Sequence, residues 1–333
     1  KISAMHPDIA IIFNAPLPSR YTACNEDAAV SGVMEAVNAV EQALIDLDCR
    51  PLPVPLVPPI EEALSTLGKI DASAIFNLFE GFAGSPETEV DIACGALSLN
   101  IPVTGNPPEA LMLGLDKVAS KKTFLSKGIP TPGFQVFDSP SAEELTLRFP
   151  VIAKPSRDDA SHGIYAENVL HSRLLLERVL AKLLESSGAP VLVEEFIDGR
   201  EFNATVIGGE VLPVSEISYS LPEGMPRVLT FESKWNPESL YYQQTKVICP
   251  AQVSFKQEAE IKELASRAYK ACGCHGYARV DIRQDECGNL YVLEVNPNPD
   301  ISPGAGCARQ AAAAGLTYTE LIKKILEIAL ERS

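Results

Sequence analysis

Two apolar segments near the carboxyl end of the sequence carry polar side chains at alternate positions. Arg279 and Asp281 alternate in the first, and Glu294 and Asn296 alternate in the second. Alternate side chains of a β-strand share a face, so a hairpin of these segments would gather all four on one sheet face. Carboxylate and amide oxygens suit Mg²⁺ that is shared with phosphate groups. We therefore predict a magnesium site at Asp281, Glu294 and Asn296, against the alternative of a solvated face with a surface salt bridge.

Further upstream, charged side chains end two other apolar segments. Lys154 follows one of them and precedes a polar loop, a place where a lysine can bind phosphate while loop amides complete the cradle. Glu194 and Glu195 end the next segment, and Glu201 follows a turn. These carboxylates could accept hydrogen bonds from ribose hydroxyls or an adenine amine. Each feature taken singly is also explained by ordinary exposed charge.

The elements that would position these groups divide into an amino-terminal open sheet and a later mixed part. In the first part, apolar periodicity predicts strands that alternate with helices, a pattern typical of a doubly wound parallel sheet. The predicted strands are 9–14, 74–79 and 101–105, and the predicted helices are 31–47 and 88–99. Repeated prolines in 52–59 predict an extended connection there. A helix over 116–127 and a breaker cluster at 128–132 lead into the second part.

The second part predicts an antiparallel sheet covered by helices. Its expected strands are 151–153, 164–166, 191–196, 202–207, 211–217, 277–283 and 290–295. Its expected helices are 170–184, 258–272 and 318–330, the last two covering the final sheet. On the final strands, Val280, Ile282, Leu293 and Val295 are expected to face this covering layer.

Composition excludes several classes of protein. The 333 residues are 46% hydrophobic, which is ordinary for a chain that buries a sizeable core. The net charge of −16 argues against wrapping nucleic acid, and no apolar run is long enough to cross a membrane. With no signal pattern, we expect a cytoplasmic protein whose eight cysteines are free thiols. Cys272, Cys274 and His275 could suggest zinc, but a helix that ends at a glycine explains that cluster better.

Taken together and in order, these segments resemble the ATP-grasp superfamily, most closely the D-alanine–D-alanine ligases, over about residues 101–321. The pieces that carry the resemblance are 101–105, 115–117 with Lys121, 128–132, Lys154-Pro155, 194–196 with Gly199 and Glu201, 278–281 and 294–296. The implied fold class is α/β, with α+β character in the carboxy-terminal part. The implied domains are a Rossmann-like amino-terminal domain (1–112), a central lid subdomain (113–190) and a carboxy-terminal subdomain with the metal site (191–333).

The resemblance also implies roles for individual residues. Lys117 and Lys154 would hold ATP phosphates, the adenine pocket would include Glu194, Glu195, Phe196 and Ile197, and Glu201 would bind ribose. Asp281, Glu294 and Asn296 would hold two Mg²⁺ ions, with Mn²⁺ as an alternative metal. The candidate catalytic residues are Arg279 on the transferred phosphoryl group or later oxyanion, Lys234 of a mobile loop, and Ser161 of the nucleotide loop.

Departures from the family pattern concern the substrate side. Glu26 stands near, but not at, the place of a glutamate that binds the first alanine's ammonium group, and it could instead compensate a helix dipole. His162 interrupts the nucleotide loop, Trp235 replaces a tyrosine, and Asp300 replaces a glycine beside the acceptor pocket. An acid there disfavours a free carboxylate and favours an amine or cationic group.

The function that follows is an ATP-dependent carboxylate–amine ligase that forms an amide bond through an acyl phosphate and releases ADP and phosphate. Its substrates are expected to be a small-molecule carboxylate and amine, with amino acids other than two D-alanines. The alternatives are a cell-wall D-alanine–D-alanine ligase and a non-catalytic nucleotide-binding regulator. A homodimer through the amino-terminal domain is expected by analogy alone.

Overall fold

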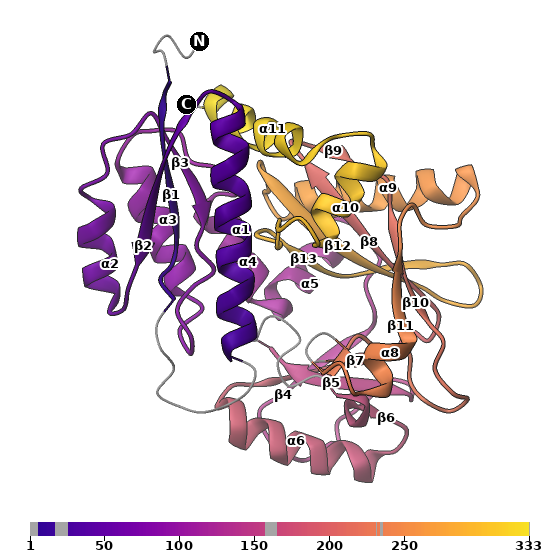
Figure 1. Cartoon of the computed structure of the whole chain (residues 1–333). Helices are drawn as coiled ribbons and strands as arrows, with labels where there is room; N and C mark the ends of the chain where they lie inside the picture. Colours follow the sequence, from indigo (N-terminus) through magenta and orange to yellow (C-terminus); the bar gives the residue numbers. More distant parts are fainter. Residues whose placement is uncertain (1–5, 17–25, 157–164, 231, 234–235, 333) are drawn as a thin grey trace.

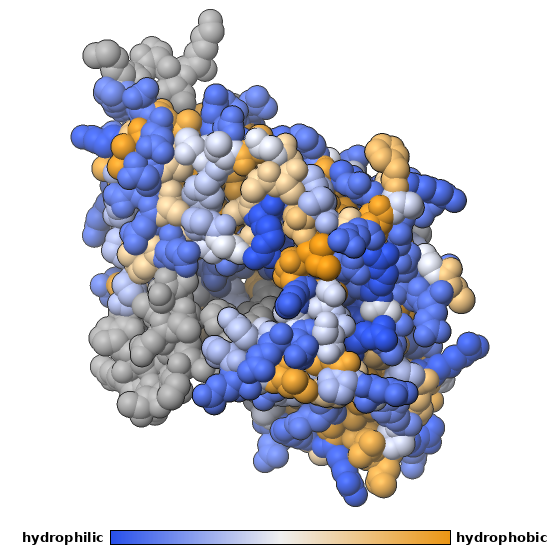
Figure 2. Space-filling view, turned by 45° about the vertical axis from the view of Figure 1, so that its right-hand side comes forward, coloured by the Kyte–Doolittle hydropathy of each residue, from blue (hydrophilic) through white to orange (hydrophobic). Residues whose placement is uncertain are grey.

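Three β-sheets organise the residues that the computed structural model describes, namely 6–16, 26–156, 165–230, 232–233 and 236–332. In Figure 1 the amino-terminal sheet and the carboxy-terminal sheet lie side by side, and the four-stranded central sheet lies below them. Hydrophilic side chains predominate on the face in Figure 2, where apolar ones form separate small patches. None of the helices in these ranges combines the length and apolar character that a bilayer crossing requires.

The amino-terminal sheet is parallel, with helices on both faces. Its strands β1 (Asp8–Asn14), β2 (Arg50–Leu56) and β3 (Ala74–Leu78) pair in the order β2-β1-β3. One face packs against α1 (Glu26–Asp46), and the other against α2 (Ile60–Leu67) and α3 (Thr88–Ser98). The prediction of a doubly wound sheet is confirmed. The expected strand at 101–105 is reduced to a single parallel bridge between Ile75 and Val103.

The expectation of an extended connection at 52–59 is wrong, because most of this segment forms strand β2. β2 is an edge strand, and prolines at 51, 53 and 55 alternate along it. The N–H of Arg50 and the carbonyl of Leu56 form hydrogen bonds on the β1 side. The backbone groups of the even positions therefore point toward β1, and those of the prolines point away from it, toward the free edge. A proline without an N–H is tolerated at an outward position of an edge strand.

The central sheet is antiparallel and carries α6 (Arg173–Ser187) on one face. Its strands are β4 (Phe134–Phe137), β5 (Val151–Pro155), β6 (Val169–Leu170) and β7 (Val191–Glu195), in the order β4-β7-β5-β6. The strand expected at 164–166 is instead η1, a 3₁₀ turn at Ala166–Asn168, followed by β6; residue 164 itself lies outside the described residues. Because β7 pairs inside this sheet, we propose that the central subdomain extends past β7 rather than ending at residue 190.

The carboxy-terminal sheet holds the strands that carry the predicted metal ligands. Its strands are β8 (Arg200–Ile207), β9 (Glu210–Val211), β10 (Ser215–Tyr219), β11 (Thr245–Ile248), β12 (Tyr277–Gln284) and β13 (Leu290–Asn296). They pair in the order β11-β10-β8-β12-β13, with β9 on β8, and α8 (Leu240–Gln244) precedes β11. The register of this sheet determines which polar groups meet.

Helices from three parts of the chain cover this sheet. The apolar face packs against α9 (Phe255–Ala271) and against α4 (Pro108–Leu115) and α5 (Lys117–Ser126), which come from before the central sheet. α10 (Gly306–Ala313) and α11 (Tyr318–Glu331) share a core with the amino-terminal sheet and α1. α11 was expected only to cover the last sheet, and in fact it joins that sheet to the amino-terminal domain. α9 ends before Gly273, whose φ of +70° marks the helix end that the sequence predicted.

The Gln310 side chain of α10 bonds to a backbone group of β8 where the strand changes its partner. The partner of β8 changes from β10 to β9 near Thr205, and the side-chain oxygen of Gln310 accepts the Thr205 N–H at 2.8 Å. The Gln310 amide donates to Ser215 Oγ at 2.9 Å, and the residue is fully buried. The Gln310 side chain therefore replaces a missing backbone partner.

We expect Gln310→Ala to lower the free energy of unfolding by about 2 kcal/mol, because it leaves a buried backbone N–H without an acceptor. Urea denaturation followed by circular dichroism measures this change. Gln42→Ala, at an exposed position of α1, is the matched control and should change stability by less than about 0.5 kcal/mol. Equal stabilities for the two variants would contradict this account of Gln310.

Candidate active site

The polar face of the carboxy-terminal sheet brings the predicted metal ligands together. Asp281 lies directly opposite Glu294 across β12 and β13, and Arg279 lies opposite Asn296. Directly opposed side chains of an antiparallel pair share a face, with Cβ atoms about 5 Å apart. The hairpin that the alternation predicted, and the shared face of its four polar groups, are confirmed.

A bulge between Asp281 and Ile282 sets this register. It places Val292, rather than Leu293, opposite Ile282, and Val292 is buried in the core while Leu293 is only partly buried. The expectation that Leu293 faces the covering helices is therefore wrong. An extra residue on the bulged strand shifts the alternation by one, and this shift puts Glu294 opposite Asp281.

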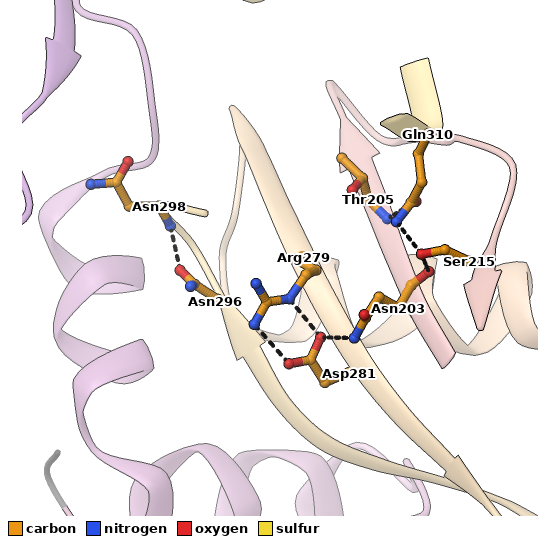
Figure 3. Close-up of polar contacts among 8 residues, drawn as sticks. All are labelled: Asn203, Thr205, Ser215, Arg279, Asp281, Asn296, Asn298 and Gln310. Carbon is orange, nitrogen blue, oxygen red and sulfur yellow. Dashed lines mark hydrogen bonds and ion pairs between the residues drawn. The ribbon is translucent and has the colours of Figure 1, made fainter. Parts of the chain in front are cut away.

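Asn203 of β8 is a fifth member of this group, and sequence reasoning missed it. It lies opposite Asp281 on the other side of β12, and its amide donates to Asp281 Oδ1 at 2.7 Å. Arg279 donates to both oxygens of the same carboxylate, at 2.7 and 2.9 Å. Figure 3 shows Asp281 between Arg279 and Asn203. The carboxylate is thus held in one orientation from two strands.

Asn298 and Asn106 connect the metal-ligand strand to the amino-terminal domain. The Asn298 N–H donates to Asn296 Oδ1 at 2.9 Å, and its amide donates to the Phe79 carbonyl and to Glu89 Oε1. Asn106 donates to the carbonyls of Tyr277 and Pro297, at 2.7 and 2.6 Å. Figure 3 shows Asn298 on the side of the amino-terminal domain. These contacts fix the end of β13 that carries Asn296.

A second group of charges lies where the central sheet meets α5. Glu194 of β7 is buried, and it forms ion pairs with Lys154 of β5, at 2.5 Å, and with Lys121 of α5. Lys121 also donates to Thr131 Oγ1 at 2.9 Å. The structure therefore joins Lys154 and Glu194, which the sequence assigned separately to phosphate and adenine, and adds Lys121.

Electrostatics within this group favour a charged carboxylate. Burial alone would raise the pKa of Glu194, but the ammonium groups of Lys121 and Lys154 outweigh burial and hold that pKa below its ordinary value. Burial would likewise lower the pKa of Lys154, but attraction to Glu194 and Glu294 outweighs it and raises that pKa. Burial lowers the pKa of Lys121, because Glu194 offsets it only in part and Lys154 repels the charge.

Lys117 lies beside one of the predicted metal ligands. It begins α5 directly after Asp116, whose carboxylate caps the helix by accepting the Ala119 N–H at 2.9 Å. Its Nζ lies 4.0 Å from Glu294 Oε2. The lysines predicted to hold phosphate therefore lie beside the carboxylates predicted to hold metal.

Glu195 and Glu201, also expected at the nucleotide, have different surroundings. Glu195 follows Glu194 on β7 and points to the opposite face, where its carboxylate accepts the Arg148 N–H at 3.3 Å. Glu201 is buried and contacts Arg283 at 2.7 Å and Tyr219 at 2.6 Å, both through Oε2. The structure brings neither carboxylate to Lys154.

Phe196 and Ile197 lie near Arg283 rather than beside the lysines. The Arg283 guanidinium lies 5.5 Å from the centre of the Phe196 ring and donates to the Ile197 carbonyl at 3.2 Å. This arrangement places an aromatic ring and a backbone carbonyl next to Glu201. Sequence reasoning did not single out Arg283 or Tyr219, because their contacts depend on the pairing of β8 with β12 and β10.

The substrate-side residues are only partly described. Asp300 is exposed, and its Oδ1 accepts hydrogen bonds from the Ser302 N–H at 2.8 Å and hydroxyl at 2.6 Å. Glu26 is the first residue of α1, and its side chain lies outside the described part. The other candidates outside the described residues are Ser161, His162, Lys234 and Trp235.

The donor set fits a divalent cation that bridges to phosphate. Asp281 and Glu294 offer carboxylate oxygens, Asn296 offers an amide, and Lys117 and Lys154 lie beside them. Hard oxygen donors next to lysines suit Mg²⁺ with a bound polyphosphate. The arrangement can therefore hold a nucleotide and screen the approach of a second anion.

Comparisons with known proteins agree with this geometry. The family model described as D-ala D-ala ligase C-terminus matches residues 124–327. A D-alanine–D-alanine ligase of Alcanivorax borkumensis is 34% identical over 279 residues, or 83% of each chain. An uncharacterized protein of Sinorhizobium fredii is 34% identical over 262 residues, which are 78% of this chain and 75% of that protein.

Solved structures with low sequence identity share the fold. The D-alanine–D-alanine ligase from Bacillus anthracis complexed with ATP has a TM-score of 0.75 at 20% identity and covers 99% of this chain and 98% of its own. VanG D-Ala:D-Ser ligase from Enterococcus faecalis has a TM-score of 0.74 at 22% identity, with coverages of 97% and 99%.

Proposed function

This chain belongs to the D-alanine–D-alanine ligase family of ATP-dependent C–N ligases with an ATP-grasp fold, and from that premise we propose that it forms an amide through an acyl phosphate. The proposed substrates are a small carboxylate and an amine, with at least one amino acid other than D-alanine. The observation that carries the proposal is that Asp281 and Glu294 lie opposite each other on neighbouring strands, with Lys117 beside Glu294. We also propose that two Mg²⁺ ions bind to Asp281, Glu294 and Asn296.

The chemistry requires two anions to meet. A carboxylate oxygen of the first substrate attacks the γ-phosphorus of ATP, and the bond from that phosphorus to the ADP oxygen breaks. Bound magnesium supplies charge screening for this approach. Lys117 and Lys154 would hold the phosphates in place, and their positive charges oppose the repulsion between substrate and nucleotide.

The second half of the reaction forms the amide. The amine of the second substrate attacks the acyl carbon of the acyl phosphate, its extra proton is lost, and phosphate leaves with the broken C–O bond. Arg279 would stabilise the oxyanion that develops on the acyl group. A turn away from Asp281, to which it donates through two nitrogens, would free those two groups for the oxyanion. Asn203 would keep Asp281 oriented after that change.

The proposed change of substrate depends on the loop that follows β13. Asp300 is an exposed acid in that loop, and Ser302 holds its carboxylate by two hydrogen bonds. A negative charge beside an acceptor pocket opposes a substrate with a free carboxylate and attracts a cationic one. We therefore propose an acceptor whose distal end is neutral or positively charged.

The second candidate function is D-alanine–D-alanine ligation itself. It is favoured by the relative of that name that is 34% identical over 83% of both chains. In this case Asp300 would face away from the acceptor. A homodimer is part of either proposal and can be checked by light scattering.

Phosphate release from ATP and Mg²⁺ tests the proposal over a matrix of D- and L-amino acids, small acids and amines. We expect release only with particular pairs, and the product amide should appear by mass spectrometry in equal amount. A preference for two D-alanines would support the second candidate. Tight ATP binding with no phosphate release for any pair would contradict ligase activity.

A further inference from the structure

Lys121 is the most deeply buried charge of the site, and its position separates it from the other lysines. Its side chain is 0% exposed, whereas those of Lys117 and Lys154 are each 8% exposed. A group without accessible surface does not contact a ligand. The contribution of Lys121 must therefore act through the residues that it touches.

The contacts of Lys121 hold it firmly against Glu194. Its Nζ pairs with Glu194 and donates to Thr131 Oγ1, and the Phe134 ring lies 5.9 Å away. Thr131 in turn donates to the carbonyl of Val292, two residues before Glu294 on β13. Lys121 thus joins α5, the central sheet and the metal-ligand strand at one point.

Lys121, Lys154 and Glu194 together carry one positive charge. Glu194 is shared by two lysines, Lys121 and Lys154, so this trio carries one net positive charge. With only one lysine, the same carboxylate would form a neutral pair. A buried neutral pair has no excess charge to attract a phosphate, and its lysine would have to abandon a buried carboxylate to reach one.

We infer that Lys121 is a positioning residue that keeps Lys154 available to the ATP phosphates by sharing the charge of Glu194. The inference rests on the proposed ATP-dependent function and assigns a role to a residue that touches neither nucleotide nor metal. When Lys154 turns to a phosphate, Glu194 stays paired with Lys121. The buried carboxylate is then never left without a partner, which would be costly.

Four variants test this role by direct binding of ATP with Mg²⁺, measured by isothermal titration calorimetry, and by melting temperature. We expect Lys121→Met to raise the Kd of ATP at least about tenfold, because Glu194 then holds Lys154 alone. Glu194 is itself assigned to the adenine pocket, so the double variant K121M/E194Q is compared with the single variant Glu194→Gln. These two should bind ATP within about threefold of each other, because neither keeps a carboxylate that could hold Lys154. Lys122→Met, at the exposed neighbouring position, is the matched control and should bind normally.

The double variant decides the question even if Lys121→Met does not fold. Loss of a merely structural lysine would weaken binding in either background, so clearly weaker ATP binding by folded K121M/E194Q than by Glu194→Gln would overturn the inference. Normal binding by folded Lys121→Met would overturn it too. Failure of the unmodified protein to bind ATP would instead contradict the proposed function, which separates the two failures.

Discussion

Glu294→Gln is expected to reduce phosphate release at least about 100-fold, the upper end of losses seen when even an outer-shell partner of a metal is removed. Glu294 lies opposite Asp281 and 4.0 Å from Lys117, so it borders both the predicted metal and the phosphates. Glutamine keeps the shape and one oxygen donor but loses the charge that holds a divalent cation. The rate should recover in part at high Mg²⁺, because the loss acts through metal affinity.

Glu286→Gln provides the control for this experiment. Glu286 is an exposed carboxylate in the turn between β12 and β13, so it repeats the change of charge on the same hairpin away from the site. Its phosphate release and Mg²⁺ dependence should match those of the unmodified protein. A normal rate and normal Mg²⁺ dependence for folded Glu294→Gln would contradict the assignment of this carboxylate to the metal site.

Gly199→Ala is expected to destabilise the protein by about 3 kcal/mol or more, as overpacking against rigid backbone does. Gly199 directly precedes β8, and a Cβ there would lie 1.9 Å from the Gln284 carbonyl oxygen. That carbonyl belongs to β12, paired with β8, so neither strand can move aside without breaking the ladder. Denaturant unfolding measures the loss.

Gly306→Ala is the matched control for Gly199→Ala. It lies at the start of α10, where a Cβ would meet no atom within 4 Å, and alanine favours helix over glycine. Its stability should be unchanged or slightly higher. Similar losses in both variants would show that the close approach at Gly199 is not the cause.

The sequence predicted the metal-ligand hairpin because its signal is local. Arg279 and Asp281 alternate on one strand and Glu294 and Asn296 on the next, so a short-range rule was enough to place them on one face. Two strands of the doubly wound sheet, β1 and β3, were found because their apolar runs are also local signals. A proline-rich edge strand was missed, since composition normally argues against strand where prolines repeat.

The partners of these groups were beyond the reach of local rules. Asn203 and Asp281 are 78 positions apart, and Asn106 bonds to the Tyr277 carbonyl across 171. Only the pairing of distant strands brings them together. Asn203 does share alternate positions with Glu201 and Thr205, so the polar face of β8 was visible in the sequence, but not the strand that it would meet.

The same dependence on distant pairing explains why the ion pair of Lys154 and Glu194 was not predicted. Lys154 and Glu194 each resembled a separate nucleotide contact, and nothing in the sequence indicated that β5 and β7 would place them in one ion pair. The bulge between Asp281 and Ile282 is similar, because a single extra residue leaves no clear pattern in composition.

The prolines of β2 bear on how copies of this protein can meet. With residues 51, 53 and 55 facing outward, the free edge of the amino-terminal sheet presents carbonyl acceptors but lacks N–H donors at those three positions. A strand from another molecule could not form a regular ladder there, so this edge is protected from edge-to-edge aggregation. Self-association through this domain is therefore not expected to extend the sheet at β2.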